Sequence, residues 1–137
     1  MSQPATARTA AKPTLDQQRA QFAWAAASTA KTALGGSFDA YRNLAKGAPS
    51  LIMGNGLMAA LAFYASRKDK KESEAGRLLD DLGEWLRQRG LPKGFVPLME
   101  ALQKADSREY MRYTEESLAM LRWLRQFADA VRKTEGD

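Results

Sequence analysis

The sequence predicts a single all-α domain, a compact bundle of about five to six helices. Three observations support this class. The 137 residues suffice for one hydrophobic core and are too few for two. Apolar residues recur at helical spacing along most of the chain, whereas no run alternates with period two between hairpin turns. Ten glycines and five prolines, with 45% apolar and 27% charged residues, are typical of a globular chain.

The opening segment, residues 1–13, is rich in Thr, Ala, Gln and Pro and has no helical periodicity. We expect it to be a disordered tail in front of a helical domain over residues 14–133. The tail lacks the apolar stretch of a secretory signal. The longest apolar run, residues 51–65, is interrupted by glycines and falls short of the roughly 20 residues that cross a bilayer. These features predict a cytoplasmic protein with no membrane segment.

The first two helices are predicted from capping residues. Thr14 with Gln17 three positions later forms a capping-box pattern, and helical spacing of apolar residues continues from there to a Gly-Gly pair. This pattern predicts a helix over 14–34. Ser37 can cap a short second helix over 37–46, because a glycine and a proline just beyond it indicate a stop.

A third helix is predicted over 50–67, where apolar residues follow one broad helical face. The triplet Gly54-Asn55-Gly56 lies inside it, and each interior glycine costs about 1 kcal/mol relative to alanine. Either the backbone packs tightly against a neighbouring helix, or Asn-Gly forms a turn between two shorter helices. A third reading is the close approach of a partner's backbone. Asn55 could offer its amide to a phosphate or another subunit, although a buried asparagine satisfied within the core is the commoner arrangement.

Three more helices follow. A stripe of leucines around Trp85 predicts a fourth helix that ends before Gly90. A short fifth helix is expected over 96–105. Asp106, with a glutamate three positions later, opens the last and longest helix, whose apolar stripe extends to Val131.

The residue content argues against catalysis. The chain has no cysteine and no histidine, which excludes disulfides, thiolate zinc sites, iron–sulfur clusters and the commonest general base. The pairs Asp80-Asp81 and Glu115-Glu116 are adjacent in helices, so their carboxylates diverge and solvated faces explain them. We found no Gly-rich phosphate loop and no nucleophile elbow. We therefore expect no enzymatic activity, no cofactor and no metal. A metal-dependent hydrolase that uses Asp80 and Glu84 is the third-ranked hypothesis.

Positive charge is concentrated in the first half of the chain. Residues 1–68 hold eight Lys and Arg against two acids, giving +6, whereas the remainder holds thirteen against fourteen, giving −1. Such a bias suits an anionic partner, either nucleic acid or a membrane surface. Arg42 and Lys46 lie four apart, with no acid at a matching spacing, and are expected to form a positive patch. The candidate RNA-binding residues are Arg19, Lys31, Arg42, Lys46, Arg67 and Lys68.

Two further groups of residues are not expected to contact a ligand. They are arginines of the last helix and four aromatic residues. Arginines of the last helix are expected to pair with Asp129 rather than with a ligand. Four aromatic residues lie in apolar stripes and are predicted to be core, so that no base-stacking platform is expected. These aromatic residues are Trp24, Tyr41, Tyr64 and Trp85.

Two segments resemble a known family. LIMGNGL at residues 51–57, followed by ALAF at 60–63, is similar to the signature of the small, fifth subunit of type III-B CRISPR effector (Cmr) complexes. The elements DSREY, TEE and LRWLRQFA within 106–128 resemble the closing segment of that family. The likeness spans about residues 14–132, and Arg122 departs from the asparagine expected at its position.

The resemblance implies a non-catalytic subunit in antiviral defence. In that family the small subunit is present in several copies and lines a ribonucleoprotein beside the guide RNA and target RNA. Its partners would be other Cmr subunits, further copies of itself and RNA. Guide–target pairing supplies the sequence choice in such systems, so the protein needs to recognise only backbone charge and shape. The alternative is a helical adaptor that binds only protein and has no direct RNA contact.

Overall fold

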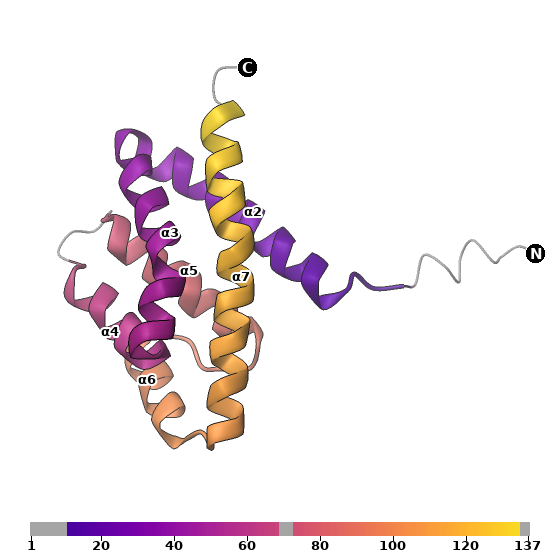
Figure 1. Cartoon of the computed structure of the whole chain (residues 1–137), viewed down its shortest axis with the longest axis vertical. Coiled ribbons are helices and arrows are strands. Elements are labelled where there is room, and N and C mark those ends of the chain that lie inside the picture. Colours follow the sequence, from indigo (N-terminus) through magenta and orange to yellow (C-terminus); the bar gives the residue numbers. More distant parts are fainter. Residues whose placement is uncertain (1–10, 69–72, 135–137) are drawn as a thin grey trace, which may run out of the picture.

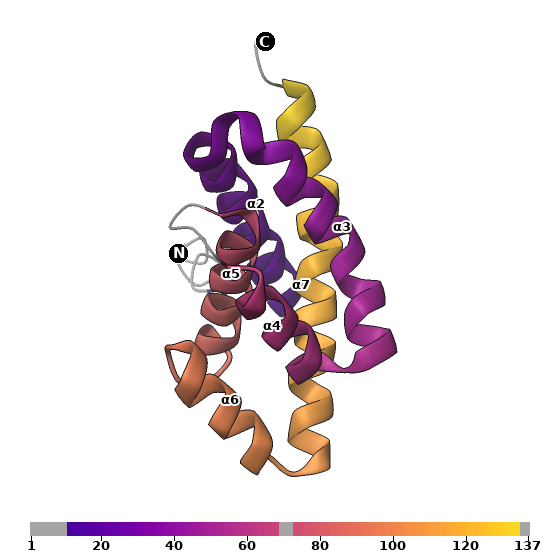
Figure 2. The same ribbon diagram turned by 90° about the vertical axis from the view of Figure 1, so that its left-hand side faces the viewer.

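Helix α7 (Ser107–Thr134) runs almost the whole height of the molecule, and the remaining helices pack along it (Figures 1 and 2). The computed structural model describes residues 11–68 and 73–134. In chain order these residues form α2 (Leu15–Leu34), the 3₁₀ helix η1 (Gly35–Ser37), α3 (Phe38–Asn55), α4 (Leu57–Ser66), α5 (Glu74–Gln88), α6 (Phe95–Lys104) and α7. The described part of the chain contains no strand, and its six α-helices confirm the all-α prediction.

One continuous apolar core lies between these helices. Helices α2 and α3 both contact α7, and α5 contacts α3, α4, α7 and α2. Figure 1 places α6 at the end of the molecule opposite the C-terminus of α7. The largest fully buried side chains are Trp85, Tyr41, Tyr64, Ile52, Leu57, Leu61, Leu78, Leu82, Leu86, Leu102, Met120 and Leu121. None of the described helices combines the length and apolarity needed to cross a membrane.

The predicted start and end of the first helix are confirmed. The Thr14 hydroxyl accepts the backbone N–H of Gln17 at 3.0 Å, and the Gln17 side chain accepts the backbone N–H of Thr14 at 2.7 Å. This reciprocal pair satisfies two N–H groups that a helix start otherwise leaves open. Gly35 ends the helix with φ +53°, a conformation that favours glycine. The predicted tail, residues 1–13, falls almost entirely on residues 1–10, outside the described part.

The predicted boundary between the second and third helices is wrong. Helix α3 continues through Gly47 and Pro49 instead of stopping at residue 46. Its buried positions Phe38, Tyr41, Ala45, Ala48 and Ile52 keep a three- and four-residue spacing across the proline. Proline inside a helix costs about 3 kcal/mol, because it removes one hydrogen bond and crowds the preceding turn. Continued burial of this face offsets that cost, which the local signals alone did not reveal.

The chain breaks instead at Gly56, between α3 and α4. Gly56 has φ +95° and ψ 160°, a region that only glycine adopts readily. Just beyond it, the backbone N–H of Met58 donates to the Tyr110 hydroxyl of α7 at 3.0 Å. Of the readings left open for the triplet, the turn between two helices is correct. Asn55 is exposed rather than buried, and a Cβ added at Gly54 would meet no atom within 4 Å.

The last three helices match their predictions closely. Helix α5 buries the predicted leucine stripe around Trp85, and the hydroxyl of Ser73 caps its start by accepting the N–H of Gly76. Helix α6 is displaced by one residue from the predicted range. The Asp106 carboxylate accepts the N–H of Glu109 at 2.8 Å at the start of α7, as the capping pattern indicated.

Candidate nucleic-acid interface

The predicted RNA-binding cations mostly face α7. Because α2 and α3 pack against that helix, four of the six point at it rather than straight into solvent. These four are Arg19, Lys31, Arg42 and Lys46. The other two, Arg67 and Lys68, lie at the end of α4.

Three of the four converge near the C-terminal end of α7. There they join a fourth cation of α7 itself, around two carboxylates. We call this group the cationic cluster, and it consists of Lys31, Arg42, Lys46 and Arg132 with Asp39 and Asp129. Arg42, Lys46 and Arg132 carry three positive charges against the two carboxylates, an excess of one among these five residues.

Short ion pairs hold the cluster together. The Arg42 Nη1 lies 2.8 Å from Asp129 Oδ1, and the Lys46 Nζ lies 3.0 Å from Asp129 Oδ2. Asp39 lies 2.8 Å from the Arg132 Nε and 3.5 Å from the Arg42 Nε. The prediction that no acid could neutralise Arg42 and Lys46 is therefore wrong. Asp39, three residues before Arg42, was visible in the sequence, but Asp129 is brought in only by the fold.

Lys31 lies at the C-terminal end of α7. Its Nζ donates to the carbonyl oxygens of Val131 at 3.0 Å and Arg132 at 3.4 Å, and lies 5.8 Å from the centre of the Phe38 ring. The C-terminal carbonyls of a helix carry partial negative charge, so an ammonium group is favourable there. These bonds hold Lys31 against the backbone of Val131 and Arg132 at the end of α7.

The two carboxylates remain ionised at neutral pH. The Arg132 hydrogen bond lowers the pKa of Asp39 against a smaller opposing effect of desolvation. Hydrogen bonds from Arg42 and Lys46 lower the pKa of Asp129. The excess charge of the cluster is therefore maintained throughout the neutral range. Arg132 binds Asp39, so the expectation that it pairs with Asp129 is wrong.

Arg19 lies apart from the cluster in a paired, largely buried setting. Its guanidinium donates to both carboxylate oxygens of Glu116, at 3.1 and 2.7 Å, and lies 3.3 Å from Asp16. The side chains of Arg19 and Glu116 are only 20% and 10% exposed. The solvated face expected for Glu116 is thus wrong, because α2 covers it. The ion pair between Arg19 and Glu116 therefore stabilises the contact between α2 and α7.

Arg67 and Lys68 border two different cavities. The Arg67 guanidinium lies 4.9 Å from the centre of the Phe63 ring, on the side of a hollow of about 830 Å³ between α3, α4 and the start of α5. Lys68 borders a separate cavity of about 520 Å³ beside α5 and α6. Both side chains are exposed, and no contact joins them to the cationic cluster among the described residues.

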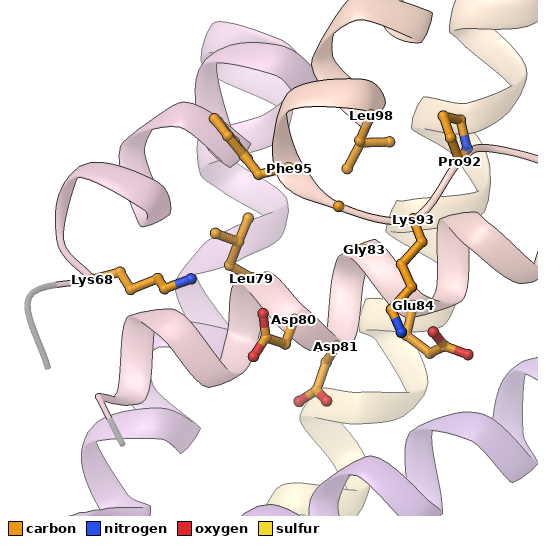
Figure 3. A pocket seen from close by; sticks show the side chains of 11 residues that line it. Lys68, Leu79, Asp80, Asp81, Gly83, Glu84, Pro92, Lys93, Phe95 and Leu98 are labelled. Carbon is orange, nitrogen blue, oxygen red and sulfur yellow. The ribbon is translucent and has the colours of Figure 1, made fainter. Parts of the chain in front are cut away.

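The cavity beside α5 contains the acids considered for metal binding. Figure 3 shows Asp80 and Glu84 on α5, with the Lys93 side chain extending from the following loop toward Glu84. Arg87 lies 2.6 Å from Glu84, and its hydrogen bonds lower the pKa of Glu84 to about 2. Within the described residues, no three carboxylates gather as metal ligands. This cavity has apolar side chains together with three acids and two lysines in its lining.

Asp81 is only partly exposed and is bonded to the core rather than lying on a solvated face, contrary to the prediction. Its carboxylate accepts the Tyr41 hydroxyl at 2.5 Å across the α3–α5 contact. Burial raises the pKa of Asp81 to about 7, while the Tyr41 hydrogen bond and Arg77 act in the opposite direction. A tyrosine of the core thus supplies a hydrogen bond to a half-buried carboxylate at the edge of the cavity beside α5.

An aromatic surface, not predicted from the sequence, runs along the α2–α7 seam. Tyr41, Tyr64 and Trp85 are buried as expected, but Trp24 is 47% exposed. Alanines, not Trp24, form the buried stripe of α2. The buried face of α2 follows the alanines at 23, 26, 27 and 30, and Trp24 lies outside that face. An apolar stripe defined by these alanines would have predicted an exposed Trp24.

Comparisons with known proteins all indicate one family. The family model of the CRISPR-associated protein Cas_Cmr5 matches residues 15–131. The CRISPR system Cmr subunit Cmr5 of Thermus thermophilus is 36% identical over 91 residues, which cover 66% of this chain and 74% of that protein. The crystal structure of a Cmr5 family protein from the same species aligns with a TM-score of 0.71 at 34% identity, covering 87% of this chain and 98% of the other.

Proposed function

Because this chain belongs to the CRISPR-associated Cmr5 family, we propose that it is the non-catalytic small subunit of a type III-B Cmr ribonucleoprotein in the cytoplasm. Its partners are the other Cmr subunits and further copies of itself. Its part in antiviral defence is to support the guide RNA and target RNA, while target cleavage belongs to other subunits. The absence of histidine and cysteine from the sequence agrees with a non-catalytic role.

The observation that supports the RNA contact is the positive excess of Arg42, Lys46 and Arg132 over the two carboxylates of the cationic cluster. Ion pairs with Asp39 and Asp129 hold Arg42, Lys46 and Arg132 in fixed positions, yet leave one positive charge in excess among these five residues. A prearranged cluster of this kind attracts phosphate without ordering long side chains at the moment of binding. Lys46 and Arg132, with side chains 38% and 46% exposed, are the members with most access to solvent.

The other predicted residues take different parts in the proposal. Arg67 and Lys68, exposed at the end of α4, are secondary phosphate contacts. Arg19 holds α2 on α7 through Glu116 and contributes to RNA binding only by keeping the bundle in shape. Such contacts recognise the RNA backbone irrespective of sequence.

The test compares two double variants of the full chain that remove the same charge. Lys46→Gln with Arg132→Gln removes two cations of the cluster, and Arg87→Gln with Lys93→Gln removes one cation bound to Glu84 and one that borders the cavity beside α5. Arg87 is a close match for Arg132, because their side chains are 45% and 46% exposed and each binds one carboxylate.

Binding of a fluorescent oligouridylate is measured over a series of salt concentrations. The cluster variant should bind more weakly, with a log–log salt slope smaller by about 1.4, since each lost phosphate contact removes about 0.7 for single strands. The control should keep the slope. Equal slopes in both variants and the parent chain would refute the cluster as an RNA contact. If crosslinks from the assembled complex then reach only protein, the adaptor alternative holds.

A further inference from the structure

Trp24 is an exposed aromatic side chain that neighbouring rings hold in place. Its ring meets Phe127 of α7 edge to face, with centroids 5.3 Å apart and planes at 89°. Phe127 stacks on Trp123 at 5.5 Å, and the Trp123 indole N–H donates to Asp16 at 3.1 Å. The Trp24 side chain is nevertheless 47% exposed, and its own N–H donates to none of the described residues. A large ring with a free donor at the surface is typical of an anchor in a protein interface.

A hollow on the other side of the molecule contains a hydroxyl group without a partner. It lies between α3, α4 and the start of α5, measures about 830 Å³ and has apolar walls that include Ala40, Leu44 and Phe63. We call it the α3–α4 hollow. Tyr64, which also lines it, is 1% exposed, and its hydroxyl has no hydrogen bond with any described residue. The Tyr64 oxygen is open to the hollow, because it does not belong to the fully enclosed unpaired atoms of the described part of the chain.

The titration of Tyr64 agrees with this setting. Burial raises the pKa of Tyr64 to about 12, as expected for a phenol that is removed from water without a charged partner. A hydroxyl in such a place is available to accept a hydrogen bond from a ligand that enters the hollow.

The exposed surface around both features carries few charges. Between residues 17 and 34, and again between residues 40 and 66, every fully exposed residue is uncharged. The charged residues of these two ranges bind α7, and they are Arg19, Lys31, Arg42 and Lys46. The lining of the hollow adds one cation and one acid, Arg67 and Glu74. Depletion of charge marks the centre of protein interfaces, and it also lets two copies with the same net charge of +5 approach each other.

Trp24 and the α3–α4 hollow supply what the other lacks. The exposed indole needs an apolar cover and an acceptor for its N–H, whereas the hollow offers apolar walls and the Tyr64 oxygen. Its volume lies within the range of roughly 300–1,000 Å³ that is usual for pockets that enclose a ligand. Trp24 cannot reach the hollow of its own chain, because it packs on Phe127, and Figure 1 places α3 and α4 on the opposite side of α7 from the N-terminal half of α2.

We infer that Trp24 of one copy inserts into the α3–α4 hollow of a second copy, where its indole N–H donates to the Tyr64 hydroxyl. This deepens the proposed function and rests on its placing several copies side by side. Because the two contact surfaces differ, the interface is heterologous: each copy keeps one surface free for the next, and the copies form an open row.

The experiment measures self-association of the full chain by sedimentation velocity over a series of protein concentrations in the absence of RNA. Trp24→Ser removes the ring that inserts, and Ala40→Phe fills the hollow with a ring of the chain itself. Tyr64→Phe removes the acceptor alone. Gln103→Phe, which adds the same ring at an exposed position of α6, is the control for Ala40→Phe. Thermal unfolding of each variant establishes that the bundle is intact, and Tyr64→Phe should unfold no earlier than the parent, because its hydroxyl makes no bond within the described fold.

The average mass of the parent should rise continuously with concentration. Trp24→Ser should weaken association at least about 30-fold, as expected for an aromatic anchor, and Tyr64→Phe about 2- to 12-fold, as expected for one hydrogen bond. Ala40→Phe should abolish association, and Gln103→Phe should match the parent. An equimolar mixture of Trp24→Ser and Ala40→Phe should form dimers with one copy of each, because the first variant keeps the hollow and the second keeps the indole.

Three results would overturn the inference. They are a parent that stays monomeric at every concentration, equal association of Trp24→Ser and parent, and a mixture of the two variants that fails to pair. Stronger association of Ala40→Phe than of Gln103→Phe would also overturn it, since it would indicate general apolar adhesion. The double variant Lys46→Gln with Arg132→Gln should self-associate like the parent. If that variant loses salt-dependent RNA binding while the parent stays monomeric, the proposed RNA contact stands and only the interface fails.

Discussion

Arg19 and Glu116 form a bidentate ion pair that joins the first turns of α2 to the middle of α7. The shorter of its two contacts, between Arg19 Nη2 and Glu116 Oε2, is 2.7 Å. The two residues are 97 positions apart in the chain. Two parallel N–H···O bonds fix the rotation of the planar guanidinium as well as its distance. The pair therefore sets how α2 crosses α7, and with it the position of Trp24 and Lys31 farther along α2.

Removing one partner of this pair should destabilise the fold. Glu116→Gln leaves the largely buried guanidinium of Arg19 without its main carboxylate, and we expect a loss of about 2–3 kcal/mol in the free energy of unfolding, measured by urea denaturation. The double variant Arg19→Met with Glu116→Met should recover most of that loss, because no unpaired charge remains. If Arg19→Met lowers RNA affinity in a stably folded protein, Arg19 is a direct contact after all.

Asp81 should make stability depend on pH. Its pKa is raised from 3.8 to about 7, so the folded state retains a proton that the unfolded state releases. The resulting stabilisation is fully present below about pH 4 and is lost as pH rises through 7, by at most about 1.4 kcal/mol per pH unit. Asp81→Asn removes this dependence, and its stability relative to the parent should increase between pH 5 and 8 in urea titrations. Asp80→Asn, at the exposed neighbour, should show no such trend; parallel curves for parent and Asp81→Asn would contradict the buried-acid account.

The two glycines around Asn55 should respond in opposite directions to alanine. Gly56→Ala forces a side chain into a backbone region reserved for glycine and should cost about 1–3 kcal/mol. Gly54→Ala places a methyl group in open space inside α3 and should stabilise by about 0.5–1 kcal/mol. Thermal or urea unfolding of both variants checks the pair. A stabilising Gly56→Ala would mean that the break between α3 and α4 is not where the structure places it.

Removing a carboxylate from the cationic cluster should strengthen RNA binding. Asp129→Asn frees Arg42 and Lys46 from their shared partner and removes one negative charge from the cluster. We expect tighter oligouridylate binding at low salt, together with a loss of about 1 kcal/mol of stability from the broken ion pairs. Glu115→Gln makes the same charge change on an exposed residue nearer the start of α7 and should have a smaller effect on affinity. Equal effects would show that only total charge matters.

Signals within one or two helical turns predicted the helices well. Thr14, Gln17 and Asp106 cap helices as their side-chain chemistry requires, because these contacts are made between neighbours in sequence. Pro49 misled the prediction, since the free energy that keeps α3 helical through it comes from burial against other helices. The Gly56 break was only one of several readings, because the Tyr110 hydroxyl that accepts the Met58 N–H just beyond it lies 52 residues farther along the chain from Met58.

The amino-acid sequence by itself determined an all-helical domain without histidine or cysteine chemistry and with its positive charge in the first half. Only the tertiary structure decided which charges remain available: Glu116 binds Arg19, whereas Asp129 is shared by Arg42 and Lys46 in a cluster that keeps a positive excess. It also decided that Trp24 lies at the surface of the α2–α7 seam. Periodicity reports the spacing of apolar side chains within one helix, but charge compensation and exposure depend on which residues another helix brings alongside.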